Sequence, residues 1–264
     1  MRLLWIGFGI GTHLLFAFTV LRLYPFLEGT SHGYAERLAA AMPGPWYLVD
    51  LVLVTQFGLL HSWLLHPRTR KKLAKLIPSP QYGCFFCVTT CLSLLLTIEG
   101  WQHSAGGLWH LEGWPGWAMH GAFLLSWAAL LYSLHLTGLG FQTGFTPWWA
   151  WVRGQPSPSR TFAPRGAYRW LRHPVYLSFL GLIWCTTLMT WDRVILVAVW
   201  TAYIFVGSYL KDQRLLFYLG DTYREYQARI PGYPFFPIGP LARVPLAHRP
   251  VPVSHRQPPA RLAS

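Results

Sequence analysis

Long apolar runs alternate with short polar segments along this sequence. A helix needs about 20 apolar residues to cross a bilayer, and several runs reach or approach that length. We therefore expect transmembrane helices over residues 3–24, 46–65, 82–98 and 117–139. Two shorter apolar legs follow, Val175–Thr190 and Val194–Leu210, which we interpret as a tight helical hairpin that also crosses the membrane. The predicted fold class is all-α, a polytopic membrane helix bundle of about six spans that includes this C-terminal hairpin.

The composition supports this prediction. Hydrophobic residues make up 53% of the chain and charged residues only 12%, whereas soluble domains average about 25% charged residues. The chain also contains 15 tryptophans, a residue that concentrates where a membrane meets water. The lipid bilayer is therefore an expected partner, and an ordinary soluble domain is excluded.

The formal net charge of +13 raises the question of a nucleic-acid partner. A nucleic-acid-binding domain gathers its basic residues on one folded polar face, but here they lie in loops between apolar runs. If every span crosses, all Lys and Arg except Arg22, Arg37 and Arg193 lie on the side of the N-terminus. Basic residues favour the cytoplasmic side, so we expect both termini to be cytoplasmic and expect no nucleic-acid binding.

The chain divides into three expected parts. Residues 1–139 hold the N-terminal transmembrane helices, and residues 140–237 hold a cytoplasmic loop, the hairpin and a polar C-terminal region. Residues 238–264 are rich in Pro, Arg and Ala, and we expect a disordered tail there. Cys84, Cys87 and Cys91 share one helix face, but no His or second Cys pair completes a ligand set. We expect them to pack in the bundle and expect no metal site.

Polar residues flank the hairpin. Arg172, His173 and Pro174 precede it, and Asp212 follows its second leg. If both legs cross, these residues return to one membrane face, where Arg172 could bind a carboxylate and His173 could exchange a proton. Alternatively, Arg172, His173 and Pro174 could form a membrane-boundary anchor, with Arg172 reaching toward water. Tyr223 could likewise belong to an amphipathic segment at the membrane surface. Spacing alone leaves both interpretations open.

A polar patch within the second span is another candidate. Gln56, His61 and Ser62 interrupt an otherwise apolar run, and polar residues inside membrane spans are often functional. We consider His61 a candidate catalytic base or orienting group. A hydrogen bond to a neighbouring helix is the structural alternative.

The C-terminal motifs resemble those of a known superfamily. Arg172-His173-Pro174-Val175-Tyr176, the hairpin, and Leu219-Gly220-Asp221-x-Tyr223-x-x-Tyr226 resemble the signature of the isoprenylcysteine carboxyl methyltransferase and phospholipid methyltransferase superfamily. Gln56-x4-His61-Ser62 and Trp184-x-Thr186-Thr187-x-Met189-Thr190 resemble methanethiol S-methyltransferases and the related NnrU membrane proteins.

The resemblance implies a cofactor site and an activity. It implies S-adenosylmethionine as the cofactor, with these binding residues: Arg172, His173, Pro174, Tyr176, Asp212 and Tyr223. It implies methylation of a small thiol, which reacts as the thiolate, with methanethiol converted to dimethyl sulfide in a bacterial inner membrane. For this reaction we expect His61 and His173 to be the catalytic residues. The alternatives are an isoprenylcysteine or phospholipid acceptor, and a non-catalytic NnrU-type protein. The superfamily's acidic pair is here reduced to Asp212, since Lys211 and Gln213 flank it.

Overall fold

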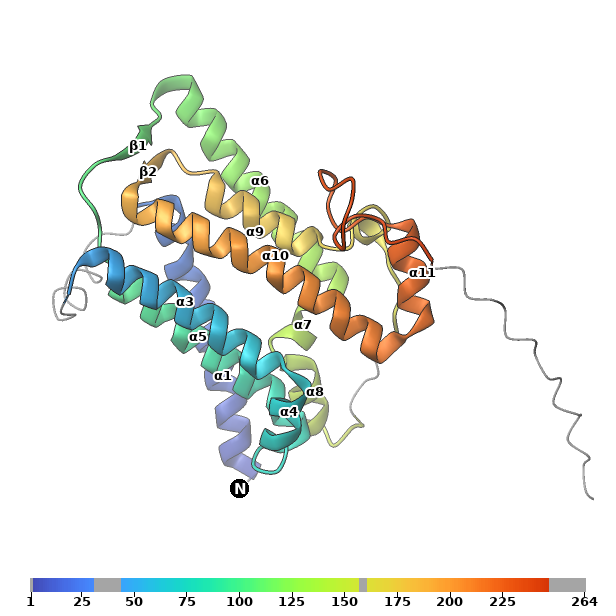
Figure 1. Cartoon of the computed structure of the whole chain (residues 1–264). Coiled ribbons are helices and arrows are strands. Elements are labelled where there is room, and N and C mark those ends of the chain that lie inside the picture. Colours follow the sequence, from blue (N-terminus) through green and yellow to red (C-terminus); the bar gives the residue numbers. More distant parts are fainter. Residues whose placement is uncertain (1, 31–43, 157–160, 247–264) are drawn as a thin grey trace, which may run out of the picture.

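The protein is a bundle of long helices (Figure 1), described by a computed structural model over residues 2–30, 44–156 and 161–246. Five helices are long and apolar enough to cross a membrane, among the described residues. These are α1 (Arg2–Glu28), α3 (Trp46–Leu65), α5 (Tyr82–Gly100), α6 (Gly113–Thr137) and α10 (Trp191–Leu219). A shorter apolar helix, α9 (Pro174–Trp184), lies beside them. The predicted all-α polytopic class is confirmed.

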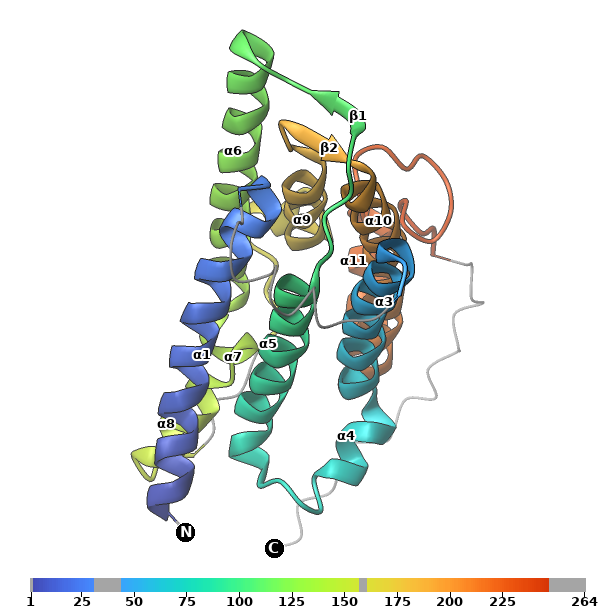
Figure 2. The same ribbon diagram turned by 90° about the vertical axis from the view of Figure 1, so that its left-hand side faces the viewer.

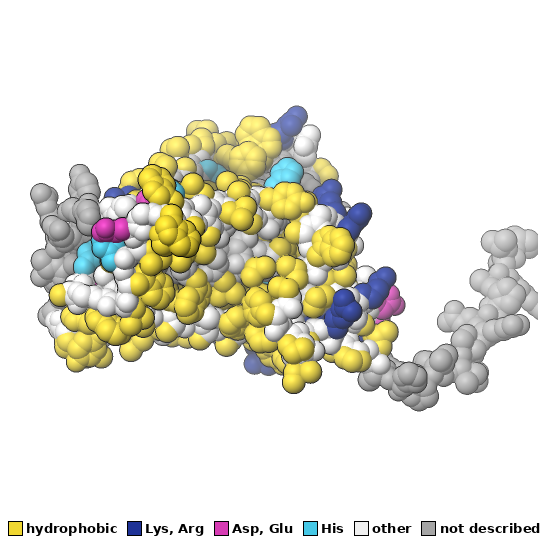
Figure 3. Space-filling view, turned by 90° about the horizontal axis from the view of Figure 1, so that it is seen from above, with side chains coloured by type: hydrophobic (Ala, Val, Ile, Leu, Met, Phe, Trp, Pro, Cys, Tyr) yellow, Lys and Arg dark blue, Asp and Glu magenta, His cyan; other side chains and the backbone are white. Residues whose placement is uncertain are grey.

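The outward faces of these helices are apolar. Leu14 on α1 is 68% exposed and Leu125 on α6 is 70% exposed, and Figure 3 shows apolar side chains over much of the face it draws. In water such continuous apolar surface would be costly, whereas lipid tails accommodate it. The bundle therefore keeps only one side of each long helix for packing against its neighbours.

Short elements connect the long helices. They include two strands, β1 (Gly107–His110) and β2 (Leu188–Thr190), and these short helices: α4 (Pro67–Leu73), η1 (Ser79–Gln81), α7 (Leu139–Gln142), α8 (Phe145–Val152), η2 (Gly166–Arg169) and α11 (Asp221–Arg229). Figure 1 shows β1 and β2 at one end of the bundle, and α4, α7, α8 and α11 toward the other. We call the first the strand end and the second the α11 end.

The first leg of the hairpin differs from the prediction. It was expected to be helical over Val175–Thr190, but α9 ends at Trp184, and its 11 residues rise only about 16 Å. The chain then forms β2, which pairs antiparallel with β1. Non-helical backbone at membrane depth must find hydrogen-bond partners inside the protein. β1 supplies them, and Leu111 N also donates to Thr187 O at 2.8 Å.

The second leg is longer than predicted. α10 runs for 29 residues to Leu219, not to Leu210, so Asp212 lies within a helix and not in a loop after it. The helix can continue through Asp212 because a hydrogen bond from within the protein satisfies this buried carboxylate. Gly220, with a φ of 55°, ends the helix, in a conformation that favours glycine.

The helices pack in a few close pairs. α6 packs on α9, α1 on α5, and α3 on both α5 and α10, an arrangement that Figure 2 shows from the side. The apolar core lies between α1, α3, α5, α6, α9 and α10, and its most buried members include these: Leu27, Phe123, Leu182, Met189 and Leu196. The trio Cys84, Cys87 and Cys91 is also buried, where α5 faces its neighbours.

The folded part of the chain extends further toward the C-terminus than expected. Residues 238–246 were assigned to a disordered tail, yet Leu241 and Ala242 are buried. Gly232 N donates to Leu241 O at 2.8 Å, and Val244 N donates to Gln227 O at 3.1 Å. The segment is fixed because its backbone pairs with α11 and with the residues after it. The rest of the expected tail, 247–264, lies outside the described residues.

Close backbone contact between α5 and the loop before α8 generates a stability prediction. A Cβ added at Gly83 would lie 2.5 Å from the Gly144 Cα, which is backbone and cannot turn aside. We expect Gly83→Ala to lower the free energy of unfolding by about 1–3 kcal/mol, measured by unfolding in detergent. Gly121→Ala in α6, where an added Cβ meets nothing within 4 Å, is the matched control. Equal stability of the two variants would contradict this packing.

Candidate functional site

Arg172, His173 and Asp212 meet at the α11 end of the bundle. Arg172 is fixed just before α9 by its own N–H, which donates to Pro231 O at 2.9 Å. Pro174 opens α9 in its first turn, where a missing N–H costs nothing. Asp212 comes from α10, and its Oδ2 accepts from Arg172 Nη2 at 2.9 Å. The sequence-based expectation that the two ends of the hairpin meet is confirmed for these side chains.

Both Nη nitrogens of the Arg172 guanidinium are satisfied by protein atoms. Nη1 donates to Gln227 O at 3.3 Å, to Ile230 O at 2.8 Å and to Ala242 O at 2.9 Å. Nη2 donates to Pro240 O at 2.9 Å besides Asp212, and only Nε is buried without a partner. Arg172 is 1% exposed, so it holds the segment after α11 onto the hairpin.

His173 is the least satisfied member of the group. Its Nε2 lies 3.2 Å from Asp212 Oδ1, close enough for an ion pair but misaligned for a hydrogen bond, and Nδ1 has no partner among the described residues. Burial lowers the pKa of His173, although Asp212 opposes the shift. The imidazole is therefore mainly neutral at pH 7 and keeps at least one nitrogen available.

Tyr223 completes the group around the carboxylate. Its hydroxyl on α11 donates to Asp212 Oδ1. Burial, together with the Asp212 charge, raises the pKa of Tyr223, so the phenol keeps its proton. We call Arg172, His173, Asp212 and Tyr223 the Asp212 cluster; each is 1% exposed or less.

The residues after α11 cover this cluster. The Tyr233 ring lies 5.5 Å from the His173 ring, and Ser208 of α10 bonds to the Tyr233 hydroxyl at 2.5 Å. A Cβ at Gly232 would lie 2.6 Å from Leu241 O and 3.1 Å from His173 Cδ2, so only glycine permits this approach. A ligand that touches His173 must either displace this cover or enter from the side of Tyr176.

Tyr176 links the Asp212 cluster to a more open surface. Its ring meets the His173 ring edge to face at 5.6 Å. On its other side Lys211 Nζ lies 5.2 Å from the ring centroid, and a Cβ on Gly207 would lie 3.5 Å from Tyr176 Cε1. Tyr176 and Lys211 are half-buried, so they are less enclosed than the cluster itself.

His61 is not a member of the cluster. Its Nδ1 lies 2.8 Å from the Tyr203 hydroxyl on α10, which also accepts from Ser62 Oγ at 3.3 Å. Tyr203 precedes Asp212 on α10 by nine positions, a rise of about 14 Å. The sequence analysis missed Tyr203, although a phenol within an apolar span was a signal that it could have used.

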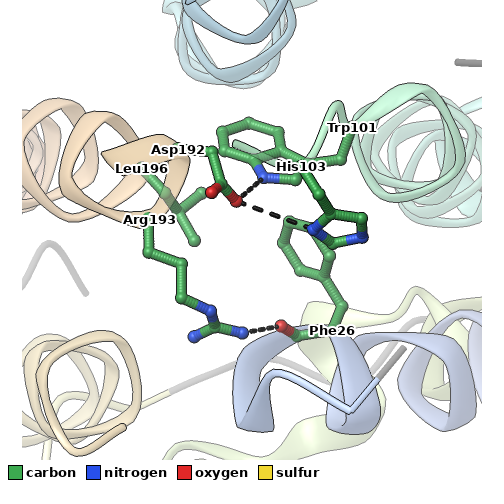
Figure 4. A pocket seen from close by; sticks show the side chains of 6 residues that line it. All are labelled: Phe26, Trp101, His103, Asp192, Arg193 and Leu196. Atoms are coloured by element: carbon green, nitrogen blue, oxygen red, sulfur yellow. Dashed lines mark hydrogen bonds and ion pairs between the residues drawn. The ribbon is translucent and has the colours of Figure 1, made fainter. Parts of the chain in front are cut away.

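A second polar cluster lies at the strand end of the bundle (Figure 4). The buried Asp192 accepts from Trp101 Nε1 at 2.9 Å and from Ser104 Oγ at 2.7 Å. Arg193 donates to Leu27 O at 2.9 Å and to Phe26 O at 2.5 Å. These bonds tie the end of α1 and the loop after α5 to the start of α10, around a small cavity. The arrangement is structural, since its charged atoms already have partners.

No metal centre is evident in the described residues. Within ranges 2–30, 44–156 and 161–246, no group of three or more His, Cys, Asp and Glu side chains could hold a metal ion. The Asp212 cluster offers one imidazole, one carboxylate, one guanidinium and one phenol.

These features define the class of protein. A bundle of apolar helices with apolar outward faces, and with ionic clusters buried between them, is an integral polytopic membrane protein. The Arg-His-Pro corner and its carboxylate lie together at one end of it.

The chain is similar to proteins named methanethiol S-methyltransferase and to proteins named nurim. It is 27% identical over 226 residues to the methanethiol S-methyltransferase of Pseudomonas sp. (strain GM41(2012)), covering 83% of this chain and 85% of that protein. It is 28% identical over 203 residues to that of Mycobacterium tuberculosis, covering 74% and 80%. It is also 25% identical over 239 residues to nurim of Rattus norvegicus, covering 84% and 90%. The chain is a relative of these proteins, and the resemblance inferred from its motifs is confirmed.

No family model matches the sequence, and no solved structure matches it significantly. The names of the relatives indicate a methyltransferase.

The strand-end cluster generates a prediction about pH. A hydrogen bond and the charge of Asp192 raise the pKa of His103, whose ordinary value is about 6.5. Protonated His103 therefore stabilises the fold below about pH 6.5, and this contribution is lost as pH rises through the raised pKa. The effect is small because the His103 side chain is 50% exposed.

We expect the melting temperature in detergent to fall less steeply between about pH 6 and pH 8 in His103→Asn than in the unmodified protein. His110→Asn is the control, because the His110 side chain is 65% exposed beside an exposed Glu112. Identical pH dependence of all three proteins would contradict the His103–Asp192 pairing.

Proposed function

We propose that this protein is an S-adenosylmethionine-dependent methyltransferase of the membrane, with the sulfur of a small thiol as its acceptor. Methanethiol, with dimethyl sulfide as product, is the named candidate. We further propose a bacterial inner membrane with both termini cytoplasmic, supported by the basic α4 and by Lys211 and Arg214 at the α11 end.

The observation that carries the proposal is the meeting of the Arg-His-Pro corner with Asp212. These residues are 40 positions apart in the chain, yet they bond directly. The methanethiol S-methyltransferases are similar over most of the chain, including this region. The names of these relatives suggest the reaction, and we propose the buried cluster as its site.

The residues present fit a cofactor that carries amino, carboxylate and nucleoside groups. His173 has buried ring nitrogens without a hydrogen-bond partner, and Tyr176 offers an aromatic face beside it. Pro174 begins α9, the helix that carries Tyr176. Arg172, Asp212 and Tyr223 are occupied with one another, so we assign them the role of holding His173 and Tyr176 in place.

Bound S-adenosylmethionine would supply a methyl group on a positively charged sulfur. The chain must align the acceptor sulfur with that methyl group and keep water out. Residues 231–242, which cover the cluster, would exclude water from the His173 side together with the apolar start of α9. His173 would orient the cofactor, since its pKa is lowered and its ring is neutral.

His61 would act on the acceptor. When Nδ1 donates to the Tyr203 hydroxyl, Nε2 is free to take the proton of a thiol. When the Tyr203 hydroxyl donates to Nδ1, Nε2 carries a proton and would hold a thiolate by a hydrogen bond. The 2.8 Å contact is compatible with both tautomers, so a mutation must decide between a base and an orienting group.

The first test is activity in cells fed with methanethiol. We expect headspace dimethyl sulfide to rise on expression and to fall at least 100-fold in His173→Ala, on the order of a lost positioning group. His66→Ala, at the exposed start of α4, is the control and should keep activity. No dimethyl sulfide above that of non-expressing cells would reject the thiol acceptor, and no binding of S-adenosylmethionine by calorimetry would reject the methyltransferase.

The second test separates the roles of His61. Glutamine can donate a hydrogen bond from the position of Nε2 but cannot take a proton at neutral pH. If His61 is a base, His61→Gln and His61→Ala lose activity equally, by about 10²–10⁴-fold. If it orients a thiolate, His61→Gln keeps most activity and works better as pH rises. Full activity in both variants would remove His61 from the mechanism.

One specific observation favours a second candidate, a non-catalytic membrane protein. Both Nη nitrogens of Arg172 are committed to protein atoms, and relatives named nurim are similar over most of the chain. A purified protein that binds no S-adenosylmethionine at millimolar concentration would favour this candidate.

A further inference from the structure

We infer that Arg214, and not Arg172, binds a ligand carboxylate at the entrance to this site. The inference rests on the proposed function and names a residue that the sequence motifs do not single out. Two observations support it. Among the described residues Arg214 lacks the hydrogen-bond partners that the other buried or half-buried arginines have, and it lies on the same face of α10 as Tyr203.

Among the described arginines, only four are buried or half-buried: Arg22, Arg172, Arg193 and Arg214. Arg22 binds Glu99 through two hydrogen bonds of 2.7 and 3.0 Å. Arg172 and Arg193 bind carbonyls and other acceptors within the protein. Arg214 has no hydrogen-bond or ion-pair partner within the part of the chain that the structure describes.

A half-buried guanidinium without a partner is costly. It has five N–H donors in a planar fork, and partial burial removes part of the water that would satisfy them. The neighbouring acid on α10, Asp212, is already committed to Arg172 and Tyr223. The acids of α11, Asp221 and Glu225, are exposed and pair with Arg224 and Arg229.

Arg214 lies on a defined face of α10. Tyr203, Gly207, Lys211 and Arg214 follow at intervals of four, four and three residues, which places them on one side of a helix; we call this the Tyr203 face. Tyr203 carries His61, and Gly207 and Lys211 contact the Tyr176 ring.

Electrostatics agree with this placement. The positive charge of Arg214 acts on His61, Tyr176 and Tyr203, which agrees with its place on the Tyr203 face. The residues that follow α3 add further basic groups in α4 and no acid. The Tyr203 face is thus cationic, and within the described part of the chain the nearby Asp212 carboxylate is already committed to Arg172 and Tyr223.

A carboxylate is the anion that this geometry favours. A guanidinium binds a carboxylate through two parallel hydrogen bonds, and Lys211 adds a second positive charge one turn away. The carboxylate could belong to the methionine end of the cofactor or to a thiol acceptor that is itself an acid. Both sources share the same chemistry at Arg214.

The test uses the full-length protein in detergent and the variants Arg214→Gln and Arg214→Lys. Calorimetry measures the Kd of S-adenosylmethionine and of its decarboxylated form. If the cofactor supplies the carboxylate, Arg214→Gln should raise the Kd of S-adenosylmethionine about 10-fold or more. The Kd of the decarboxylated form should not change. Arg214→Lys should have an intermediate effect, because the charge remains but the bidentate fork is lost.

If the acceptor supplies the carboxylate, the Kd of S-adenosylmethionine should stay constant. The KM of mercaptoacetate should then rise about 10-fold or more in Arg214→Gln, with the KM of methanethiol unchanged. Arg224→Gln, an exposed residue of α11, is the control in both arms. Unfolding curves for each variant verify that the fold is kept.

Two further outcomes are distinguishable. If the unmodified protein binds S-adenosylmethionine but Arg214→Gln changes neither quantity, the role of Arg214 is overturned and the proposed function stands. If the unmodified protein neither binds the cofactor nor methylates either thiol, the proposed function and the role of Arg214 both fail.

Discussion

The buried pair of Arg172 and Asp212 is the interaction on which the α11 end depends. Two charges that are each 1% exposed are tolerated only when each finds partners, and removing one partner of such a pair costs roughly 3–5 kcal/mol. Arg172 therefore binds α10 through Asp212 and also binds backbone carbonyls within residues 227–242. These segments lie together around its guanidinium. The cover over His173 follows from this requirement, because those carbonyls belong to it.

The same rule acts at the strand end. Asp192 and Arg193 begin α10 and are buried, and the bonds that satisfy them come from α1 and from the loop after α5. The two ends of α10 thus carry the ionic contacts, while its middle is apolar. A helix anchored by charge at both ends has a fixed depth and rotation, which in turn fixes the Tyr203 face relative to α3 and α9.

The site could be predicted in part. The motif around Arg172 and the lone Asp212 predicted a shared location, because both flank one hairpin, and the structure brings them into contact. His61 was marked by polarity alone, so its neighbour was unknown; contact with Tyr203 depends on how α3 packs on α10. The sequence could not show that both Nη nitrogens of Arg172 have partners while Arg214 has none among the described residues, since both are arginines at the ends of apolar runs.

Apolar runs determined the bundle class and the bounds of several helices, and α3 has the predicted bounds, 46–65. Length and hydropathy are properties of the local chain, and lipid acts on each helix separately. Tertiary structure decided where the hairpin legs stop being helical, because β2 needs β1 as a distant partner. It also decided that α10 continues past Asp212 and that residues 238–246 belong to the fold. Those outcomes depend on contacts between segments far apart in the chain, and no local pattern records them.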